Sequence, residues 1–490
     1  MSEGVLVIYT GGTIGSKPKD PNDPSSPQVV VSGDEFKHDT KLDDFKFPVD
    51  MVSLPNPIDS CNMTPSEWKW IAGKIKETYE KYNGFVILHG TDSMVYTASI
   101  LSFMLENLGK PVVLTGAQRA HLFNLRNDAL QNIISAITIA NPQYYGLPVI
   151  PEVVVLFGTE ILRGNRTRKR DANGYTAYES PKYPPLGRVG ANIDIREELL
   201  LRRDPTKQFF VRSTIEPNVV YLQVFPGLQN TNFTSRILGD KQLKGVVCGA
   251  FGAGNIPTDA AYLGQFRSAI ADGKWVQAVT QCTLGGVELG LYETSNLLID
   301  VGFVSGTDLT PEAALCKMMI AVGDEDLKDN PALLREYLQT SVAGEQSLSV
   351  FETKYARSGA AHVEAGTDYT KRRLQADTPL AGQWRPADVS NVQLRFYGAT
   401  VTCPAEQQSV EIEIYANLAS GDDPDPSAAN FCGNFKRRPS SESGVISFDV
   451  TRTVRAIAQT GRLLPFTVVM RGESGKFAWT SAELAIFAKA

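Results

Sequence analysis

The chain has 490 residues, of which 42% are hydrophobic and 21% are charged, as is typical of a globular protein with several apolar cores. This length favours two to four domains over a single one. The formal net charge of −6 argues against a nucleic-acid partner, because such a partner needs a basic surface. The six cysteines and four histidines are scattered, without the spacing of a zinc site or a disulfide framework, so we expect no metal and no cofactor.

The sequence also argues against a membrane partner. No stretch approaches the roughly 18 apolar residues that a membrane-spanning helix needs. Residues 1–9 carry no basic segment and only a short apolar run, which is unlike a signal peptide. Together with the scattered cysteines, these features predict a cytoplasmic protein.

Residues 1–200 alternate strand and helix patterns. Three apolar runs each stop at a turn that contains glycine and threonine, and they lie at residues 5–9, 85–88 and 112–114. Continuous apolar runs of this kind are typical of buried parallel strands. Thr64, Pro65 and Glu67 predict a helix that starts with a capping box. A further helix is predicted over residues 99–108.

These patterns predict a doubly wound α/β domain with a parallel sheet over residues 1–200. In such sheets the ligand lies outside the carboxyl ends of the strands, which is where the three turns fall. A second α/β domain is predicted over residues 215–345, from three further apolar runs and a helix that opens at Thr310. The three runs lie at residues 219–222, 246–248 and 276–279.

The C-terminal part follows a different pattern. Residues 346–385 combine mixed charge with little periodicity, and we interpret them as a linker. From residue 386 apolar and polar residues alternate, with turn-rich breaks between the runs. This period of two predicts an antiparallel β-sandwich over residues 386–490.

Polar side chains stand at two of the strand ends. Thr13 follows two glycines after the first apolar run, and Thr91 and Asp92 follow the second. Glycines let the backbone approach a ligand closely, and a threonine hydroxyl can attack a carbonyl if a base removes its proton. Lys169 could take the Thr91 proton if it lay beside Asp92. On sequence alone a solvated loop lysine is the simpler interpretation of Lys169.

Residues 5–15 (VLVIYTGGTIG) and residues 84–94 (GFVILHGTDSM) resemble the two signature motifs of bacterial-type L-asparaginases. The resemblance covers about residues 1–350 and is greatest to the type I, cytoplasmic branch. It implies a two-domain asparaginase-like fold that precedes the sandwich. The implied reaction converts L-asparagine to L-aspartate and ammonia through a threonine-bound β-aspartyl ester, with glutamine as a slower substrate.

The same resemblance implies roles for individual residues. Thr13 would be the nucleophile, and Thr91, Asp92 and Lys169 would form a second triad that moves protons, although which threonine attacks first stays open. Ser60 would bind the α-carboxylate of the substrate, and Asp92 its α-ammonium. The expected substrate contacts are Gly12, Asp59, Ser60, Cys61, Gly90, Thr91, Asp92 and Ala117. Because related enzymes complete each site with a neighbouring subunit, the resemblance also implies a homodimer or homotetramer.

The chain departs from the family pattern beside Thr13. Family members often carry a tyrosine near position 28 that polarises the first threonine, whereas residues 28–31 read QVVV here. Tyr292 is the predicted replacement, from the second domain. The polar segment over residues 16–41 is either a lid or a plain loop.

Two further departures concern substrate binding and regulation. Position 61, often glutamine in the family, is Cys61 here. Some type I enzymes bind asparagine at an allosteric site with an arginine in the strand that corresponds to residues 248–251. That strand reads CGAF here, so we predict no such regulation.

The C-terminal extension resembles a different family. Residues 410–417 and 427–435 are similar to the small β-domain that ends polyphenol oxidases. The copper ligands of those enzymes lie elsewhere, so the resemblance implies packing or shielding and no copper chemistry. A generic sandwich for oligomer contacts or stability fits these residues as well.

Two alternative functions stay open. One is an amino-acid sensor without turnover, against which the presence of Thr13, Thr91, Asp92 and Lys169 together counts. The other is the asparaginase-like subunit of a tRNA-dependent amidotransferase, which would need a basic surface that faces RNA.

Overall fold

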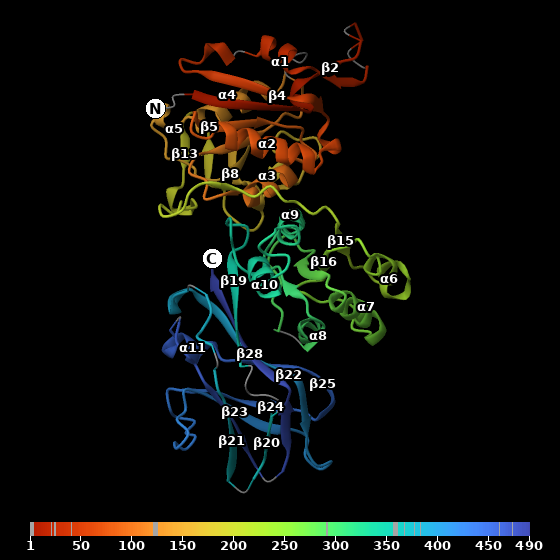
Figure 1. Ribbon diagram of the computed structural model, residues 1–490, viewed down its shortest axis with the longest axis vertical. Coiled ribbons are helices and arrows are strands. Elements are labelled where there is room, and N and C mark those ends of the chain that lie inside the picture. The colour runs from red at the N-terminus through yellow and green to blue at the C-terminus, as the bar shows by residue number, and fades with distance from the viewer. Residues whose placement is uncertain are drawn as a thin grey trace.

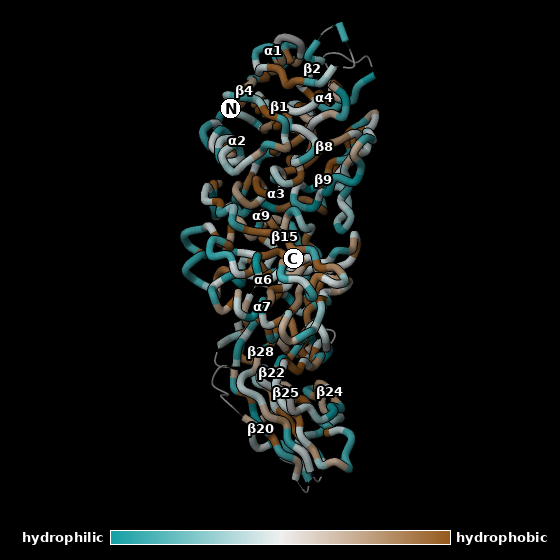
Figure 2. The backbone as a smooth tube through the Cα atoms, turned by 90° about the vertical axis from the view of Figure 1, so that its right-hand side faces the viewer, coloured by the Kyte–Doolittle hydropathy of each residue, from teal (hydrophilic) through white to brown (hydrophobic). Residues whose placement is uncertain are grey.

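Three parts follow one another along the long axis of the computed structural model, and Figure 1 shows them in chain order. The structure describes residues 4–490 apart from residues 21, 24–25, 41, 121–125, 291–292, 356–360, 367, 377, 383, 460 and 473. The parts are an α/β domain, a second α/β domain and a β-sandwich. Figure 2 shows that apolar segments run through the interior of each part. Within the described ranges no helix is long and apolar enough to cross a membrane.

The first domain contains an eight-stranded sheet with the order β13-β12-β9-β8-β7-β5-β1-β4. The predicted parallel sheet is confirmed for one contiguous block of this order. Its parallel strands are β4 (Val49–Ile58), β1 (Gly4–Gly11), β5 (Tyr82–Leu88), β7 (Val112–Thr115) and β8 (Val153–Phe157). Three short antiparallel strands extend the sheet at one edge, which makes it mixed. They are β9 (Glu160–Arg163), β12 (Gly187–Val189) and β13 (Ile193–Ile195).

The order of the strands reverses at β1. The chain passes from β1 to β4 on one side and then crosses back to β5 on the other side. In open α/β sheets a crevice forms at such a reversal, because the connections that leave the two central strands diverge. The carboxyl ends of β1 and β5 therefore border the expected ligand site.

Helices cover both faces of this sheet. On one face lie α2 (Pro65–Thr78) and α3 (Met94–Met104), and on the other lie α1 (Gly33–Asp39) and α4 (Ala129–Ala140). The predicted capping box of α2 is present, since Thr64 N donates to Glu67 Oε2 at 2.8 Å. Helix α3 starts earlier and ends earlier than predicted. Its C-terminal neighbour, β6 (Leu105–Glu106), pairs instead with β14 (Phe210–Val211).

The second domain is a four-stranded parallel sheet with helices on both faces. Its strands are β15 (Val219–Gln223), β16 (Gly245–Ala250), β17 (Trp275–Thr280) and β18 (Val304–Ser305). On one face lie α6 (Phe233–Leu238), α7 (Ala260–Ala271) and α8 (Glu293–Val301), and on the other lie α9 (Pro311–Ala321) and α10 (Pro331–Gln339). Cys316 and Ile320 of α9 reach the core of the first domain, so the two α/β domains share apolar contacts.

The third part is the predicted antiparallel sandwich. One sheet contains β19 (Leu348–Lys354), β28 (Ser481–Lys489), β22 (Val389–Thr402), β27 (Lys476–Trp479) and β20 (Ala361–Glu364), with β25 (Ser440–Asp449) also paired to β22. The other contains β21 (Tyr369–Leu374), β26 (Phe466–Arg471), β23 (Val410–Ala416) and β24 (Phe431–Arg437). Phe396, Phe448 and Trp479 are buried between the sheets.

The predicted linker over residues 346–385 is wrong. Strands β19, β20 and β21 fall inside it, and each pairs with a strand of the sandwich. Their apolar alternation is short, and β21 is an edge strand that reads YTKRRL. Edge strands tolerate such charges because only one side of their backbone is paired. The charged side chains hide the alternation of apolar and polar residues that predicts a strand.

Candidate active site

The predicted residues gather at the carboxyl ends of four neighbouring strands. Ser60 follows β4, Thr13 follows β1, Thr91 follows β5 and Ala117 follows β7. Two of the intervening turns touch, because a Cβ atom on Gly12 would collide with the backbone of Gly90. A Cβ atom on Gly90 would in turn lie 2.6 Å from Ser60 Oγ. Glycines are therefore required where the turns after β1 and β5 meet.

Thr13 begins a short 3-10 turn, Thr13–Gly15, and is half-buried. Gly12 has a φ of +81°, a left-handed conformation that glycine adopts without strain. Among the described residues, the Thr13 hydroxyl has no hydrogen-bond partner. The nearby Tyr9 hydroxyl is buried and donates to the carbonyls of Gly15 and Val31, at 3.2 and 3.1 Å. The Tyr9 hydroxyl thus bonds to these two carbonyls and not to Thr13.

The segment after Thr13 is an ordered hairpin. Strands β2 (Ser16–Pro18) and β3 (Gln28–Val30) pair antiparallel, and α1 follows them. Ser16 Oγ donates to the Gly12 carbonyl at 2.9 Å, which ties the start of the hairpin to the turn. The described part of residues 16–41 is therefore a hairpin and a helix, so the interpretation as a plain loop is wrong.

Lys169 lies within hydrogen-bond distance of both Thr91 and Asp92. Lys169 Nζ donates to Thr91 Oγ1 at 3.0 Å and to Asp92 Oδ1 at 2.7 Å. Lys169 belongs to β10 (Arg168–Lys169), which pairs with β11 (Tyr178–Glu179). The Thr91 side chain is buried, whereas the Asp92 side chain is 66% exposed. The structure thus places Lys169 beside the strand end of β5, and the interpretation as a solvated loop lysine is wrong.

Ser60 and its neighbours lie at the same strand ends. Ser60 is buried, its Oγ accepts from Asp92 N at 3.3 Å, and its carbonyl accepts from Ser93 Oγ at 2.5 Å. Asp59 caps the turn after β4 by accepting from Cys61 N at 3.4 Å, and both side chains are exposed. Ala117 is fully buried behind β7. Tyr292 lies outside the described residues.

A buried histidine supports the turn after β5. His89 Nδ1 donates to the Gly90 carbonyl at 2.7 Å, which leaves Nε2 to accept from Thr97 Oγ1 at 2.9 Å. Thr97 Oγ1 itself accepts from Trp68 Nε1 at 2.8 Å. Complete burial lowers the pKa of His89 from 6.5 to about 4. The imidazole therefore stays neutral and fixes the Gly90 peptide.

This burial predicts a loss of stability in mild acid. The unfolded state binds a proton on His89 below pH 6.5, whereas the folded state does so only near pH 4. Stability from this residue is therefore full above pH 6.5 and falls as the pH drops from 6.5 to 4, by about 3 kcal/mol in all. Urea unfolding at pH 7 and pH 4.5 measures this loss. His89→Gln should show a smaller loss over the same range, and an equal loss in both proteins would contradict the assignment.

Tyr178 is a contact that the sequence did not indicate. Its hydroxyl donates to the Thr91 carbonyl at 2.5 Å, and its side chain is buried opposite Lys169 in the β10–β11 pair. Burial raises the pKa of Tyr178, so the hydroxyl stays protonated and donates. Tyr178 thereby holds the backbone of Thr91 from the side that carries Lys169. No motif marks this residue, since the contact joins positions 87 residues apart.

Tyr178→Phe is therefore expected to lower kcat by about 10-fold, or about 1.4 kcal/mol in the activation barrier, with little change in KM. The unpaired Thr91 carbonyl should also lower the free energy of unfolding by about 1–3 kcal/mol. Steady-state kinetics and urea unfolding measure the two effects. Tyr175→Phe is the matched control, because the Tyr175 hydroxyl makes only a long, exposed hydrogen bond of 3.4 Å. Equal behaviour of the two variants would exclude the positioning role.

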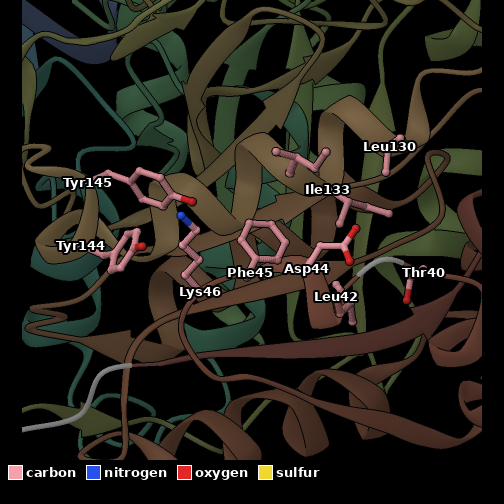
Figure 3. A pocket seen from close by; sticks show the side chains of 10 residues that line it. Thr40, Leu42, Asp44, Phe45, Lys46, Leu130, Ile133, Tyr144 and Tyr145 are labelled. Atoms are coloured by element: carbon pink, nitrogen blue, oxygen red, sulfur yellow. The ribbon is translucent and has the colours of Figure 1, made fainter.

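The apolar cavity of Figure 3 is lined by residues other than the strand-end cluster. It has a volume of about 550 Å³ and is lined by residues of α4 and α5 (Pro142–Tyr145) and by Thr40, Leu42 and residues 44–46. None of the predicted site residues lines it. The candidate active site is therefore the cluster at the strand ends, where Lys169 contacts Thr91 and Asp92 next to the turn that bears Thr13.

Comparison with known proteins identifies relatives of this chain. The family description "Asparaginase, N-terminal" matches residues 4–201, and "Glutaminase/Asparaginase C-terminal domain" matches residues 218–337. L-asparaginase 1 of Escherichia coli strain K12 is 36% identical over 331 residues, which cover 66% of this chain and 93% of that protein. The crystal structure of L-asparaginase I from Vibrio cholerae has a TM-score of 0.62 and 33% identity, and covers 71% of this chain and 100% of that chain.

A longer relative is also similar. The 60 kDa lysophospholipase of Mus musculus is 37% identical over 370 residues, which cover 70% of this chain. The match spans 62% of the mouse protein, so less than two thirds of that relative is covered. The two matched domains together span more than half of the chain, and the chain belongs to the asparaginase family.

Proposed function

We propose that this protein is an L-asparaginase, which hydrolyses the side-chain amide of L-asparagine to L-aspartate and ammonia. The observation that carries the proposal is the contact of Lys169 Nζ with both Thr91 Oγ1 and Asp92 Oδ1, next to the turn that bears Thr13. An amide hydrolase needs a hydroxyl nucleophile and a group that moves its protons. The E. coli and V. cholerae relatives, both L-asparaginases, support the choice of substrate.

The polar groups around the crevice suit a free amino acid. The exposed Asp92 carboxylate would bind the α-ammonium group. Ser60 Oγ accepts from Asp92 N and retains its own proton, which it would donate to the α-carboxylate. Each contact requires a free charged terminus, so a protein-bound asparagine would lose both. The substrate amide would then lie between the two threonine turns.

Substrate binding would also prepare the base. Lys169 Nζ donates to Asp92 Oδ1 at 2.7 Å. A substrate ammonium at Asp92 competes for the same carboxylate and adds a second positive charge nearby. Lys169 would serve as the base that accepts the Thr91 proton across the 3.0 Å contact.

In the proposed reaction Thr13 Oγ1 attacks the amide carbon, and the Thr13 proton is removed as the C–O bond forms. The C–N bond breaks, and the departing nitrogen takes up a proton and leaves as ammonia. Water then attacks the β-aspartyl ester, its proton returns to Thr13, and aspartate is released. Backbone N–H groups of the glycine turns would stabilise the oxyanion.

The group that activates Thr13 has no candidate among the described residues around it, since Tyr9 is bonded to Gly15 and Val31. We propose Tyr292 for this role, from its place in the sequence. We further propose a cytoplasmic homodimer or homotetramer that needs no cofactor. The sandwich would serve packing and would carry no copper chemistry, as its resemblance to the polyphenol oxidase β-domain implies.

Release of ammonia from L-asparagine by the purified protein, without added metal or nucleotide, tests the proposal. L-glutamine should react more slowly, because one additional methylene is worth about 1–3 kcal/mol of discrimination. N-acetyl-L-asparagine should not react, since it lacks the α-ammonium. Absence of turnover with millimolar asparagine, in protein that shows a cooperative unfolding transition, would rule out an asparaginase and favour the amino-acid sensor.

A further inference from the structure

Strand β10, which carries Lys169, is not part of the eight-stranded sheet. It consists of Arg168 and Lys169 and forms a two-stranded sheet with the equally short β11. A sheet of two such strands is at best marginally stable by itself. Contacts with other parts of the fold must therefore keep Lys169 Nζ at 3.0 Å from Thr91 Oγ1.

The second α/β domain supplies one such contact, at Arg168. Arg168 Nε donates to Glu312 Oε1 at 3.2 Å. Glu312 lies in the first turn of α9, and α9 packs next to α3 where the two α/β domains meet (Figure 1). Successive side chains of a strand point to opposite sides, so Lys169 reaches the end of β5 while Arg168 reaches α9. Strand β10 is thus held between the two domains.

The ion pair with Glu312 restrains a side chain that otherwise has room to move. Arg168 is 32% exposed and lines a cavity of about 190 Å³, together with Tyr96 and Tyr221. Within the described ranges its guanidinium makes no other hydrogen bond. Glu312 is the less exposed partner, at 12%, and belongs to a helix that is packed into both domains. Glu312 is therefore the fixed partner, and Arg168 is the partner that it holds.

The residues that precede β10 are held by the same domain. Arg166 is 1% exposed, its Nη1 pairs with Asp308 Oδ2 at 2.8 Å, and its Nε donates to the Gly344 carbonyl at 2.8 Å. Asp308 lies just before α9, and Gly344 lies between α10 and β19. The second domain therefore contacts the chain at Arg166 and again at Arg168, on the way to Lys169.

A buried ion pair fixes the carbonyl that Arg166 contacts. Lys317 of α9 and Glu345 are both fully buried and pair with each other. Glu345 Oε2 also accepts from Ala343 N at 2.7 Å, which fixes the backbone on either side of Gly344. Breaking such a pair is costly because it leaves a buried charge uncompensated. Helix α9 thus supports the approach to Lys169 through Lys317 as well as through Glu312.

We infer that Glu312 is a positioning residue for Lys169, and that through Arg168 it keeps β10 where Lys169 reaches Thr91. Glu312 lies outside the proposed substrate site and acts on the reaction only through β10. The inference rests on the proposed function, in which Lys169 accepts the proton of Thr91.

Glu312→Gln tests the inference in the full-length protein, because it removes the charge and keeps the size of the side chain. We expect kcat for L-asparagine to fall by about 10- to 10²-fold, since a misplacement of about 1 Å can cost 10²-fold. KM should change by less than about 3-fold, because the proposed substrate contacts Asp92 and Ser60 are unaltered. Arg168→Gln removes the same ion pair from the other domain and should lower kcat to the same extent. An unchanged kcat in both variants of an active enzyme would overturn the inference.

Glu413→Gln is the matched control. Glu413 has a side chain that is 4% exposed, and it pairs with Arg471 at 2.9 Å within the sandwich. The substitution therefore removes a buried carboxylate from an arginine, as Glu312→Gln does, but far along the chain from β10. It should keep full activity. A loss of kcat equal to that of Glu312→Gln would show that any broken ion pair lowers the rate, and would overturn the inference.

A cycle with Lys169→Met shows whether Glu312 acts through the lysine. Glu312→Gln should lower kcat little further in the Lys169→Met background, because the effects of coupled residues do not add. A loss as large as in the wild-type background would show that Glu312 acts on another part of the site and would overturn the inference.

Hydrogen exchange tests the contact without catalysis. In Glu312→Gln, amides of residues 166–171 should exchange faster, while those of β1 and β16 should be unchanged. Unchanged exchange at residues 166–171 would overturn the inference whatever the activity. Wild-type protein that releases no ammonia, with faster exchange in the variant, would instead refute the proposed function and leave the restraint of β10 by Glu312 established.

Discussion

Replacing Thr13 with alanine is expected to lower kcat for L-asparagine by at least about 10³-fold, because an essential nucleophile is lost. The fold should be kept, since the Thr13 hydroxyl has no hydrogen-bond partner among the described residues and the side chain is only half-buried. The free energy of unfolding should therefore change by less than about 0.5 kcal/mol. Ammonia release at saturating asparagine, with urea unfolding in parallel, measures both quantities.

Thr13→Ser is the matched control for this substitution. It keeps the hydroxyl at the same turn and should retain part of the activity, whereas Thr13→Val keeps the shape of threonine and should be as inactive as alanine. Near-normal turnover by Thr13→Ala would transfer the role of nucleophile to Thr91. Rapid mixing of wild-type enzyme with asparagine should in addition show ammonia released before aspartate if an ester accumulates.

The second large effect is expected for Lys169→Met. This change keeps the length of the side chain but removes the amine that contacts Thr91 Oγ1 and Asp92 Oδ1. We expect kcat to fall by about 10²–10⁴-fold, the range for loss of a proton-transfer group. The effect on stability should be small, because the Asp92 carboxylate is 66% exposed and remains solvated without its partner.

Arg170→Gln provides the control for loss of a neighbouring positive charge. Arg170 is 51% exposed and makes only a long contact of 3.5 Å with Glu179. If Lys169 acted only through long-range electrostatics, the two variants would lower kcat to a similar extent. A selective loss in Lys169→Met supports proton transfer, and equal small losses would exclude it.

Parts of this site could be predicted from the sequence because they depend on local chain geometry. Thr13 and Thr91 stand directly after continuous apolar runs, and parallel strands bring their carboxyl ends to one edge. Ser60 and Ala117 follow from the resemblance to the family. For these residues the strand pattern and the family motif predict where the backbone lies, and the position of the side chain follows from the backbone.

The residues that contact these side chains and turns could not be predicted from local chain geometry. Lys169 and Tyr178 approach Thr91 from a short two-stranded sheet, after a separation of 78 and 87 residues. No local pattern encodes such a distance. The resemblance to the family named Lys169, whereas nothing in the sequence marked Tyr178. The buried ion pairs of Arg395 with Glu352 and Glu483 were missed for the same reason, because these residues come from β22, β19 and β28. Arg335 of α10 also pairs with Glu352.

The strands within residues 346–385 were not predicted for a different reason. Strand β20 is only four residues long, and β21 carries three consecutive basic residues. Both lie at the edges of their sheets, where half of the backbone groups need no strand partner. Periodicity detects strands that are buried on one face over several residues, and these strands do not meet that condition.

The position of β28 has a consequence for how the protein is made. This strand, Ser481–Lys489, lies between β19 and β22 and pairs with both. Because it is central to its sheet, the sandwich cannot complete its larger sheet until residues 481–489 have left the ribosome. The two α/β domains can fold earlier, since domains generally fold as units in the order of synthesis. Nascent chains arrested before Ser481 should therefore expose the apolar face of β22 and depend on chaperones.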